Sequence, residues 1–441
     1  MSAAASPAGE GAGTFTVHGG RPLTGELRVP GDKSVSHRAL ILGALAAGTS
    51  VVRGLSHGED VARTAAALRA LGARVDDGRV SAGAGLHAPA APLDAGNSGT
   101  TMRLLAGVVA ARPWTTVLTG DASLSGRPMD RVALPLRAMG AAVTGQGPQC
   151  RPPLTVRGGA LAGIDYTTPM ASAQVKSCIL LAGTGASGET VVREPVLTRR
   201  HTEELLARCG AALREETGAD GTHVVTLRPS ALEPFELDVP GDPSQAAFWL
   251  VAGCVVAGSA LTVRGVYVGA GRRGFLDVLA RMGARIEERP VTGPADLAAT
   301  ADVVVRAGPL EGTAVDGAEI TGLDEVPALA VAAACASGDT VFRSVGELRV
   351  KESDRLSGVA ELVRAFGGRA EVDGDDLLVH GGGGLRPGAL DARGDHRMAM
   401  AAAVAGLAAG EGPTRVAGWS AVATSYPEFG RDLAHLQRAA G

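Results

Sequence analysis

Residues 67–75 read ALRALGARV, and this phrase recurs four more times along the 441-residue chain. Each copy places apolar residues at helical spacing, then a glycine, then a strand-like run, which predicts an amphipathic helix that ends at the glycine and leads into a strand. The other copies are PLRAMGAAV at 135–143, LLARCGAAL at 205–213, VLARMGARI at 278–286 and LVRAFGGRA at 362–370. Their glycines, Gly72, Gly140, Gly210, Gly283 and Gly367, follow one another at steps of 68, 70, 73 and 84 residues.

A second phrase alternates with the first and predicts six units. In it, a helix rich in small residues ends and a strand with threonine and valine begins. This period exceeds the roughly 20–50 residues of solenoid repeats, so we expect six small α/β modules, three in each of two domains. The copies are AAGTSVV at 46–52, ARPWTTV at 111–117, ASGETVV at 186–192, AGSALTV at 257–263, ASGDTVF at 336–342 and GEGPTRV at 410–416.

The segment VPGDKS at 29–34 returns as VPGDPS at 239–244, which indicates that the second half of the chain restarts there. We therefore expect the chain to cross between two domains at these two places. The first predicted domain combines residues 14–31 with 240–441, and includes a strand at 14–18 and a last helix near 428–440. The second predicted domain is 32–239, and residues 1–13 are expected to form a disordered tail.

The composition of the chain excludes several classes of protein. A chain of this length suits two cores, and 45% hydrophobic with 20% charged residues is typical of a globular protein. The net charge of -4 argues against a nucleic-acid surface, and no apolar run approaches the ~20 residues of a membrane span. Five scattered cysteines without a CxxC pair predict free thiols and no zinc site. Because the first thirteen residues also lack a signal or transit pattern, we expect a monomeric cytosolic protein without a membrane or nucleic-acid partner.

The segment PGDKSVSHR at 30–38 predicts an anion site at a helix start. Asp32 or Ser34 can cap the helix, while Lys33 and Arg38 supply charge beside free backbone N–H groups. The Walker phosphate loop requires glycine directly before the lysine, where this chain has Asp32, so that match fails. The alternative is an ordinary capped helix with a solvated first turn.

Four further helix starts in the first half carry basic or hydroxyl residues, although each alone fits a solvated helix end. GNSGTTMR at 96–103 also has glycines that let backbone N–H groups approach a ligand. Taken together in an acidic chain, the clusters favour a cleft that binds anions. The other three are SLSGRPMDR at 123–131, ASAQVKS at 171–177 and TRRHTE at 198–203.

The second half differs because its helix starts combine carboxylates with arginines. Carboxylates among cations can move protons while the arginines hold an anionic substrate. Alternatives remain for each residue: Asp324 can be a helix cap, and the run Lys351–Arg355 can be a self-paired surface segment. The three segments are TGLDEVPALA at 321–330, RVKESDRL at 349–356 and DHRMAM at 395–400.

In this order and spacing, the motifs resemble the 5-enolpyruvylshikimate-3-phosphate synthases of the enolpyruvyl transferase family, from about residue 14 to the end. The resemblance implies an α/β fold, a two-domain inside-out α/β barrel of six βαβαββ repeats with the active site in the interdomain cleft. It also implies the transfer of the enolpyruvyl group of phosphoenolpyruvate to the 5-hydroxyl of shikimate 3-phosphate. Phosphate leaves through a tetrahedral intermediate, in the pathway to chorismate and aromatic amino acids, without a metal or organic cofactor.

The resemblance assigns roles by position. Asp324 takes the 5-hydroxyl proton and Glu352 delivers a proton to phosphoenolpyruvate, although Lys33 and Glu352 are exchangeable as proton carriers. Thr198 has a looser assignment beside the sugar phosphate. The expected contacts of shikimate 3-phosphate are Lys33, Ser34, Arg38, Ser172, Ala173, Gln174, Arg199, Asp324 and Lys351. Those of phosphoenolpyruvate are Lys33, Gly99, Arg127, Gln174, Arg355 and Arg397.

Two details of the sequence qualify the resemblance. Many relatives have a lysine where this chain has Thr424, so one phosphoenolpyruvate cation is missing or comes from elsewhere. Gly99 is typical of relatives that glyphosate inhibits. The nearest alternative is the UDP-N-acetylglucosamine enolpyruvyl transferase, disfavoured because Ser34 follows Lys33 and the 119–131 loop has no cysteine. A nucleotide-binding kinase and a non-catalytic anion-binding scaffold are further alternatives, but the first lacks the Walker pattern and the second leaves Asp324 and Glu352 unexplained.

Overall fold

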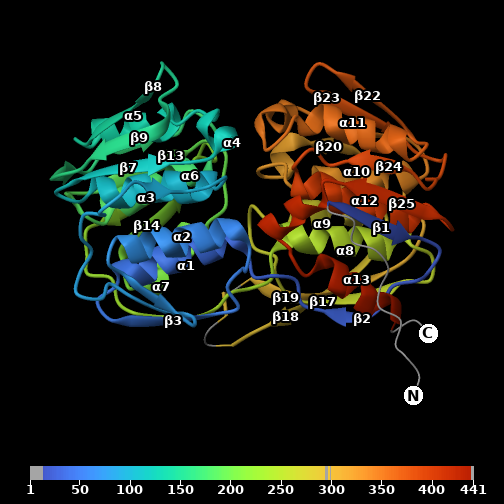
Figure 1. The fold of residues 1–441 in the computed structure, drawn as a ribbon, viewed down its shortest axis with the longest axis horizontal. Coiled ribbons are helices and arrows are strands. Elements are labelled where there is room, and N and C mark those ends of the chain that lie inside the picture. Colours follow the sequence, from blue (N-terminus) through green and yellow to red (C-terminus); the bar gives the residue numbers. More distant parts are fainter. Residues whose placement is uncertain (1–12, 294–295, 298, 439–441) are drawn as a thin grey trace.

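The computed structural model describes residues 13–293, 296–297 and 299–438. The predicted disordered tail therefore lies outside the described residues except for Gly13, as do the last residues of the predicted C-terminal helix. Figure 1 shows two lobes side by side, one built from the blue-to-green part of the chain and one mainly from the yellow-to-red part. The blue strands β1 and β2 lie in the second lobe.

Six units repeat one topology, in which a short strand pairs parallel to a central strand that pairs antiparallel to another strand. Five of these sheets have four strands, and the sixth, β1-β25-β24, has three. The six central strands begin within the second repeated phrase, as predicted: β3 (Thr49–Arg53), β7 (Thr115–Thr119), β13 (Thr190–Glu194), β17 (Ala260–Tyr267), β21 (Thr340–Arg343) and β25 (Pro413–Ala417).

The first repeated phrase forms the predicted helix, turn and strand in all five copies. Its glycines have φ values between 70° and 109°, the left-handed region in which glycine ends a helix without strain. The helices are α2 (Glu59–Ala70), α5 (Asp130–Ala138), α7 (His201–Arg208), α9 (Gly274–Arg281) and α11 (Arg355–Ala365). The strands that follow are β4 (Arg74–Asp76), β8 (Ala142–Gln146), β14 (Ala212–Thr217), β18 (Arg285–Val291) and β22 (Arg369–Asp373).

The remaining strands complete these sheets. The parallel edge strands are β16 (Glu236–Asp238), β6 (Leu93–Asp94), β11 (Asp165–Thr167), β2 (Thr24–Leu27), β20 (Ala314–Asp316) and β24 (Ala389–Asp391). The antiparallel partners are β5 (Arg79–Ser81), β9 (Arg151–Arg157), β15 (His223–Arg228), β19 (Thr300–Arg306), β23 (Asp376–His380) and β1 (Thr14–His18). A small pair links β10 (Leu161–Ala162) to β12 (Ala186–Ser187).

One helix in each unit is almost wholly buried, because it is mostly apolar and packs in the centre of its lobe, with its few charged residues at or near the N-terminal end. In the first lobe these helices are α1 (Lys33–Leu45), α3 (Gly99–Ala110) and α6 (Ala173–Gly183). In the second they are α8 (Pro243–Val255), α10 (Val326–Cys335) and α12 (His396–Ala408). Short segments α4 (Ala122–Ser125), η1 (Gly317–Glu319), η2 (Gly346–Val350) and η3 (Trp419–Thr424) and the final helix α13 (Phe429–Arg438) connect or cover these units.

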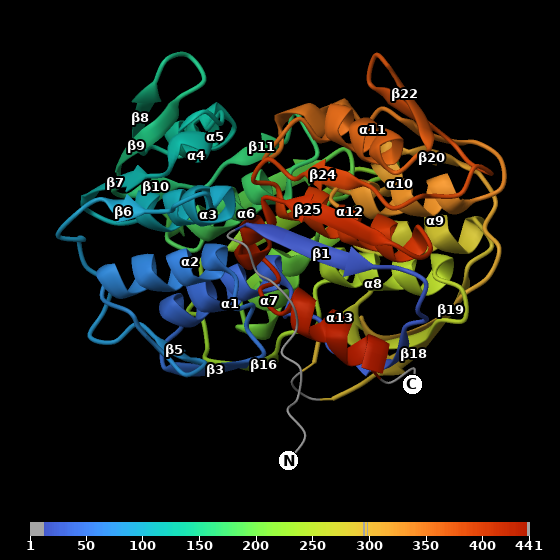
Figure 2. The same cartoon turned by 45° about the vertical axis from the view of Figure 1, so that its right-hand side comes forward.

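Two separate clusters of buried apolar residues follow the two lobes. One contains Val35 to Val239 with Tyr267 and Leu297, and the other contains Val17 to Val29 with Ala246 to Leu436. β1 pairs with β25 and α13 packs on β2, so the first strand and the last helix of the described residues both lie in the second lobe, as Figure 2 also shows. We propose domain boundaries that follow this division, at 14–31 plus 240–441 and at 32–239.

The chain crosses between the lobes twice, side by side. Gly31 and Gly241 form an antiparallel bridge, Asp32 N–H donates to the Pro240 carbonyl at 2.7 Å, and Asp242 N–H donates to the Pro30 carbonyl at 2.9 Å. The two copies of the VPGD segment are therefore the two connections between the lobes, and they hydrogen-bond to each other.

Two general predictions can be compared with the structure. Within the described residues, no helix is both long and apolar enough to cross a membrane. The five cysteines are unpaired; four are buried and Cys335 is partly exposed.

Candidate active site

One cleft between the lobes receives the N-terminal ends of all six central helices. A cavity of about 280 Å³ is lined by residues at or beside the start of each. The free N–H groups and the dipole at a helix N-terminus favour negative charge, so this arrangement favours anionic ligands. The residues are Lys33 and Ser34 of α1, Gly99 and Thr100 of α3, Ser172 and Ala173 at α6, Asp242 and Ser244 at α8, Asp324 before α10 and Arg397 of α12.

The two sides of the cleft carry different charges. We call the cleft-lining residues between 32 and 239 the first wall, and those between 240 and 441 the second wall. Among the described residues, the first wall has one carboxylate, Asp60, against Lys33, Arg38, Arg103, Arg127, Arg131 and Arg199. The second wall has Arg272, Lys351 and Arg397 against Asp242, Asp324, Glu347 and Glu352.

A buried arginine connects both crossings at the base of the cleft. Arg272 donates to Asp242 at 2.8 Å and lies 3.3 Å from both Asp32 and Glu325. Asp32 also caps α1 by accepting from Val35 N–H at 2.8 Å, which resolves the choice between Asp32 and Ser34. The sequence signal for Arg272 was the pair of arginines before α9, a pattern also present before α7, where Arg199 and Arg200 stand together.

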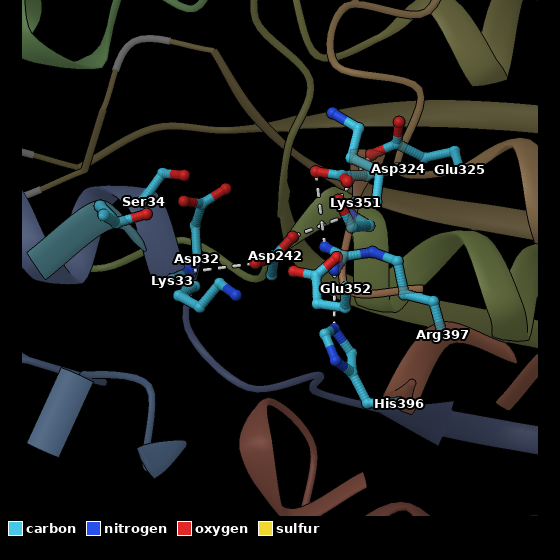
Figure 3. Close-up of polar contacts among 12 residues, drawn as sticks. Asp32, Lys33, Ser34, Asp242, Asp324, Glu325, Lys351, Glu352, His396 and Arg397 are labelled. Carbon is cyan, nitrogen blue, oxygen red and sulfur yellow. Dashed lines mark hydrogen bonds and ion pairs between the residues drawn. The ribbon is translucent and has the colours of Figure 1, made fainter. Parts of the chain in front are cut away.

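Lys33 projects from the first turn of α1 into the cleft. Its ammonium donates to Asp60 Oδ2 at 2.9 Å, and its backbone N–H donates to Asp242 Oδ2 at 3.0 Å. Burial alone would raise the pKa of Asp60, but Lys33 and His37 outweigh it and lower that pKa. Figure 3 shows Lys33 and Ser34 on one side of Asp242, with Asp324, Lys351 and Glu352 on the other. Sequence reasoning missed Asp60, because an acidic residue in the first turn of a helix is unremarkable.

Arg38 lies one turn after Ser34 and is held by neutral groups. Its guanidinium donates to Thr202 Oγ1 at 2.7 Å, to Ser177 Oγ at 2.6 Å and to the Ser34 carbonyl at 2.9 Å. Burial, followed by the charge of Arg199, lowers its pKa to about 10, so it remains cationic at neutral pH.

Three more arginines gather beside the start of α3. Arg103 donates to Gln174 Oε1 at 2.6 Å and to the Pro128 carbonyl, and Arg127 donates to Asn97 Oδ1 at 2.7 Å. Arg131 has no hydrogen bond or ion pair within the described part of the chain, and its Nε is buried. Burial, then the charges of Arg131 and Arg127, lowers the pKa of Arg103 to about 9. Among the described residues no carboxylate forms an ion pair with these guanidiniums, and we call this part of the first wall the arginine corner.

Gly99 keeps that corner open. A Cβ at this position would lie 2.8 Å from Arg103 Nη1 and 3.6 Å from Arg127 Nη1. Glycine therefore allows the arginines to approach the backbone at the start of α3.

The second wall contains two carboxylates held by arginines. Asp324 accepts from Arg199 at 2.9 Å and Arg355 at 3.2 Å, and lies 3.5 Å from Arg397. Glu352 accepts from Arg355 at 2.5 Å. Burial alone would raise the pKa of both carboxyl groups. Arg397 and Arg199 nevertheless hold the pKa of Asp324 well below its ordinary range. Arg355 and His396 do the same for Glu352. Both groups are therefore ionised at neutral pH in the unliganded protein.

Two alternatives from the sequence can now be judged. The cap residue of α10 is Glu325, so Asp324 is not the helix cap. The Lys351–Arg355 run is partly self-paired, since Glu352 contacts Arg355, but Arg355 is buried instead of lying on the surface.

The structure brings all but one of the predicted site residues to the lining of the cleft. The exception is Arg355, which is fully buried behind Glu352 and donates twice to Asp395, at 2.8 and 3.2 Å. The residues that line the cleft are Lys33, Ser34, Arg38, Gly99, Arg127, Ser172, Ala173, Gln174, Arg199, Asp324, Lys351, Glu352 and Arg397.

The two threonines considered from the sequence do not line the cleft. Thr198 is buried and donates to Glu194, and the Thr424 carbonyl lies against Gly58. Arg103, Arg131 and Arg272 are the lining cations without a role assigned from the sequence, and of these three Arg272 already contacts carboxylates.

Within the described residues, one cluster has side chains placed to hold a metal ion: Glu194, Glu203 and His223. It lies beneath α6, outside the lining of the cleft. The ammonium of Lys176 lies 2.5 Å from Glu194 and 2.6 Å from Glu203, so a cation already occupies the position between the carboxylates.

Comparison with known proteins gives a consistent result. The family model described as EPSP synthase (3-phosphoshikimate 1-carboxyvinyltransferase) matches residues 17–433. A 3-phosphoshikimate 1-carboxyvinyltransferase of Gloeobacter violaceus is 48% identical, covering 96% of this chain and 99% of its own. One of Streptococcus uberis is 42% identical, covering 94% and 98%.

Solved structures share the fold. An EPSP synthase of Acinetobacter baumannii has a TM-score of 0.84 at 38% identity, covering 96% of this chain and 98% of its own. The enolpyruvyl transferase NikO of Streptomyces tendae has a TM-score of 0.77 at 22% identity, covering 96% and 97%, which indicates a shared fold alone.

Proposed function

The chain belongs to the EPSP synthase family, and from this premise we propose that it joins phosphoenolpyruvate to shikimate 3-phosphate. The oxygen of the 5-hydroxyl forms a bond to C2 of phosphoenolpyruvate while C3 gains a proton, which gives a tetrahedral ketal. Loss of a proton from C3 and of phosphate from C2 then yields the enolpyruvyl ether. The product would enter the route to chorismate and aromatic amino acids.

This proposal rests mainly on the positive charge of the first wall. Both substrates have a phosphate and a carboxylate, and six cationic side chains face the cleft from this wall against one carboxylate. Arginine matches the planar geometry of such oxyanions, and its charge-assisted hydrogen bonds are stronger than neutral ones. A neutral acceptor would leave several of these cations without a partner.

The proposed acceptor site lies between α1, α6 and the loop before α7. Arg199 donates to Ser34 Oγ at 3.1 Å, so these two groups already face one another at the start of α1. We assign shikimate 3-phosphate to Lys33, Ser34, Arg38, Ser172, Ala173, Gln174, Arg199, Asp324 and Lys351.

The proposed phosphoenolpyruvate site lies at the arginine corner and extends to the second wall. Arg103 is held against Gln174, and Arg131 is available to an anion beside Arg127. We assign phosphoenolpyruvate to Lys33, Gly99, Arg127, Gln174 and Arg397. Arg355, although assigned to phosphoenolpyruvate by its position in the sequence, would act by fixing Glu352 and Asp324.

Proton transfer requires the bound substrates to change the charge balance. Asp324 and Glu352 have depressed pKa values because arginines surround them, which makes Asp324 a weak base and leaves Glu352 without a proton to give. Substrate anions that neutralise these arginines would raise both pKa values. Asp324 can then accept the 5-hydroxyl proton. Glu352 must first take up the proton that it delivers, whereas the ammonium of Lys33 already carries one.

We also propose that the two lobes form the inside-out α/β barrel of the family and close on the acceptor. Closure would exclude water and bring the anion-binding wall onto the carboxylate wall. A smaller radius of gyration in solution scattering with saturating shikimate 3-phosphate would support closure, and an unchanged radius would refute it. We further expect a monomeric cytosolic enzyme without a metal or organic cofactor.

The decisive experiment is phosphate release from phosphoenolpyruvate with shikimate 3-phosphate or UDP-N-acetylglucosamine as acceptor. We expect release with shikimate 3-phosphate alone. Release with the sugar nucleotide alone would assign the chain to the other transferase activity, and release with neither would refute enolpyruvyl transfer. Because Gly99 leaves the arginine corner open, we also expect glyphosate to compete with phosphoenolpyruvate, which the same assay measures.

A further inference from the structure

A fully buried lysine lies one helical turn behind the proposed acceptor site. Lys176 follows Ser172, Ala173 and Gln174 on α6, and its side chain has no exposed surface. Its ammonium lies 2.5 Å from Glu194 Oε2 and 2.6 Å from Glu203 Oε1, and both carboxylates are also fully buried. The mechanism above does not use this group.

The two glutamates lie at the two ends of one loop. Glu194 is the last residue of β13 and Glu203 lies in the first turn of α7. Between them, Arg199 projects into the cleft, where it donates to Ser34 Oγ at 3.1 Å and Asp324 Oδ2 at 2.9 Å. Thr198, directly before Arg199, donates to Glu194 Oε1 at 2.5 Å. Lys176 therefore contacts both ends of the loop that carries Arg199. Thr198, in the middle of the loop, donates to Glu194, one of the two carboxylates that Lys176 contacts.

The neighbouring residues repeat this connection between α6 and α7. Ser177, next to Lys176, lies 2.6 Å from the hydroxyl of Thr202, next to Glu203. Arg38 donates to both hydroxyl groups, at 2.6 and 2.7 Å. The same pair of helix segments thus orients Arg199 through Lys176 and Arg38 through Ser177.

Charge explains why a lysine is required to hold this geometry. Two ionised carboxylates without a cation would repel one another at this depth, and burial raises the pKa of Glu203 despite the opposing effect of Lys176. His223 lies 3.9 Å from Glu203 and 3.2 Å from Glu215, which itself pairs with Arg200 at 2.8 Å. The network continues from Lys176 to the outer end of the loop.

We propose that Lys176 is a positioning residue for the acceptor, which fixes Arg199 and, through the adjoining pair, Arg38 toward shikimate 3-phosphate. This inference rests on the proposed function, because it concerns the acceptor side of the same cleft. The same contacts could instead serve stability alone. The two readings differ when the charges are removed together, since a buried ion pair replaced by neutral groups of similar size often leaves stability unchanged.

The test uses the full-length enzyme with the triple substitution Lys176→Met, Glu194→Gln and Glu203→Gln. The Kd of shikimate 3-phosphate is measured by calorimetry, and the KM of phosphoenolpyruvate at saturating shikimate 3-phosphate. We expect the Kd to rise by about tenfold or more, equivalent to one hydrogen bond to a charged group, with little change in the KM of phosphoenolpyruvate. An unchanged Kd, or an equal rise in both constants, would overturn the proposal.

Two further variants keep the result interpretable. Val156→Ala in β9 opens a cavity in the same core without touching a charge, and should lower the melting temperature while leaving the Kd unchanged. If the triple variant does not fold, Thr198→Val removes only the hydroxyl that ties the loop to Glu194. The Kd should then rise about threefold, and an unchanged Kd would overturn the proposal.

The outcomes also separate this inference from the proposed function. If the wild-type enzyme releases no phosphate with shikimate 3-phosphate, the proposed function fails. If the wild-type enzyme is active but the variants bind shikimate 3-phosphate normally, only the role of Lys176 fails.

Discussion

The two walls of the cleft contain the same kinds of charged residue but use them differently. In the first wall, Arg38, Arg103 and Arg127 donate to neutral groups, and Arg131 has no partner within the described residues. In the second wall, the buried Arg272 and Arg397, with Arg355 behind them, contact carboxylates. Four of the six first-wall cations therefore have no carboxylate partner within the described residues, although Lys33 pairs with Asp60 and Arg199 with Asp324 of the second wall. The buried arginines of the second wall, in contrast, are already paired.

Because of this difference, the two walls have different roles in substrate binding and catalysis. Cations held by neutral partners are preorganised for an anion without an internal competitor. Carboxylates held by arginines stay ionised until the surrounding charge changes, so their proton affinity can respond to substrate binding. Changes in the second wall should consequently lower kcat or stability, whereas changes in the first wall should weaken substrate binding without lowering stability.

The largest effect is expected from Asp324→Asn in the second wall. This nearly isosteric change removes the proposed base while keeping hydrogen-bonding capacity toward Arg199, so kcat should fall about 10²–10⁴-fold with a smaller change in substrate affinity. Steady-state phosphate release measures both. Asp339→Asn, an exposed carboxylate change in the same lobe, is the matched control, and an Asp324→Asn enzyme with normal kcat would remove Asp324 from the mechanism.

Stability should respond most to Arg355→Met. The substitution leaves the buried Asp395 without its cation and also unpairs Glu352, so the free energy of unfolding should fall by about 3–5 kcal/mol. Urea unfolding followed by circular dichroism gives this value. A loss comparable with that of an exposed arginine such as Arg393 would mean that the second wall is not balanced by Arg355.

Arg131→Gln tests the first wall through substrate binding. If Arg131 forms a charge-assisted hydrogen bond to phosphoenolpyruvate, the KM for that substrate should rise roughly 10–100-fold while the Kd of shikimate 3-phosphate changes little. Arg157→Gln removes the same charge from an exposed position of β9 and should change neither. Equal KM values in wild type and Arg131→Gln would contradict the proposed contact.

A smaller effect is expected on the free energy of unfolding at acidic pH. The folded pKa values of Asp324, Glu352 and Asp395 are depressed, so their contribution to stability is complete above the ordinary carboxyl pKa of about 4 and is lost as the pH falls through the lower folded values. Arg355→Met should flatten this acid dependence, by up to about 1.4 kcal/mol per pH unit for each carboxylate, whereas Arg131→Gln should not. Parallel unfolding curves against pH in all three proteins would argue that Arg355 does not set these pKa values.

The repeated phrases allowed much of the fold to be predicted. Glycines such as Gly72 end helices because they adopt the left-handed conformation, a local property that the sequence records directly. The two VPGD segments predicted the crossings because they are copies of one another. The edge strands were harder to predict from the sequence. β16 and β2 join their sheets from distant parts of the chain, so their pairing depends on tertiary structure.

The site was predictable where charge and helix starts coincide. Lys33, Arg127 and Asp324 could be placed in one cleft because they stand at helix N-termini that the fold directs to one place. The sequence could not show that Arg355 is buried behind the carboxylates that line the cleft, because its partner Asp395 is 40 residues distant. The sequence placed Lys176 in one of the basic helix starts that favour an anion-binding cleft, but its side chain turns to buried carboxylates instead. The sequence could not show this, since these charge partners lie on β13 and α7.

The most direct test of the central claim is the thermal unfolding of Arg131→Gln without substrates. If the first wall carries uncompensated positive charge, removing this guanidinium relieves repulsion among Arg103, Arg127 and Arg131, and the melting temperature should equal or exceed that of the wild-type enzyme. A clear fall in the melting temperature would show that Arg131 already has a stabilising partner, and would contradict the division between the two walls.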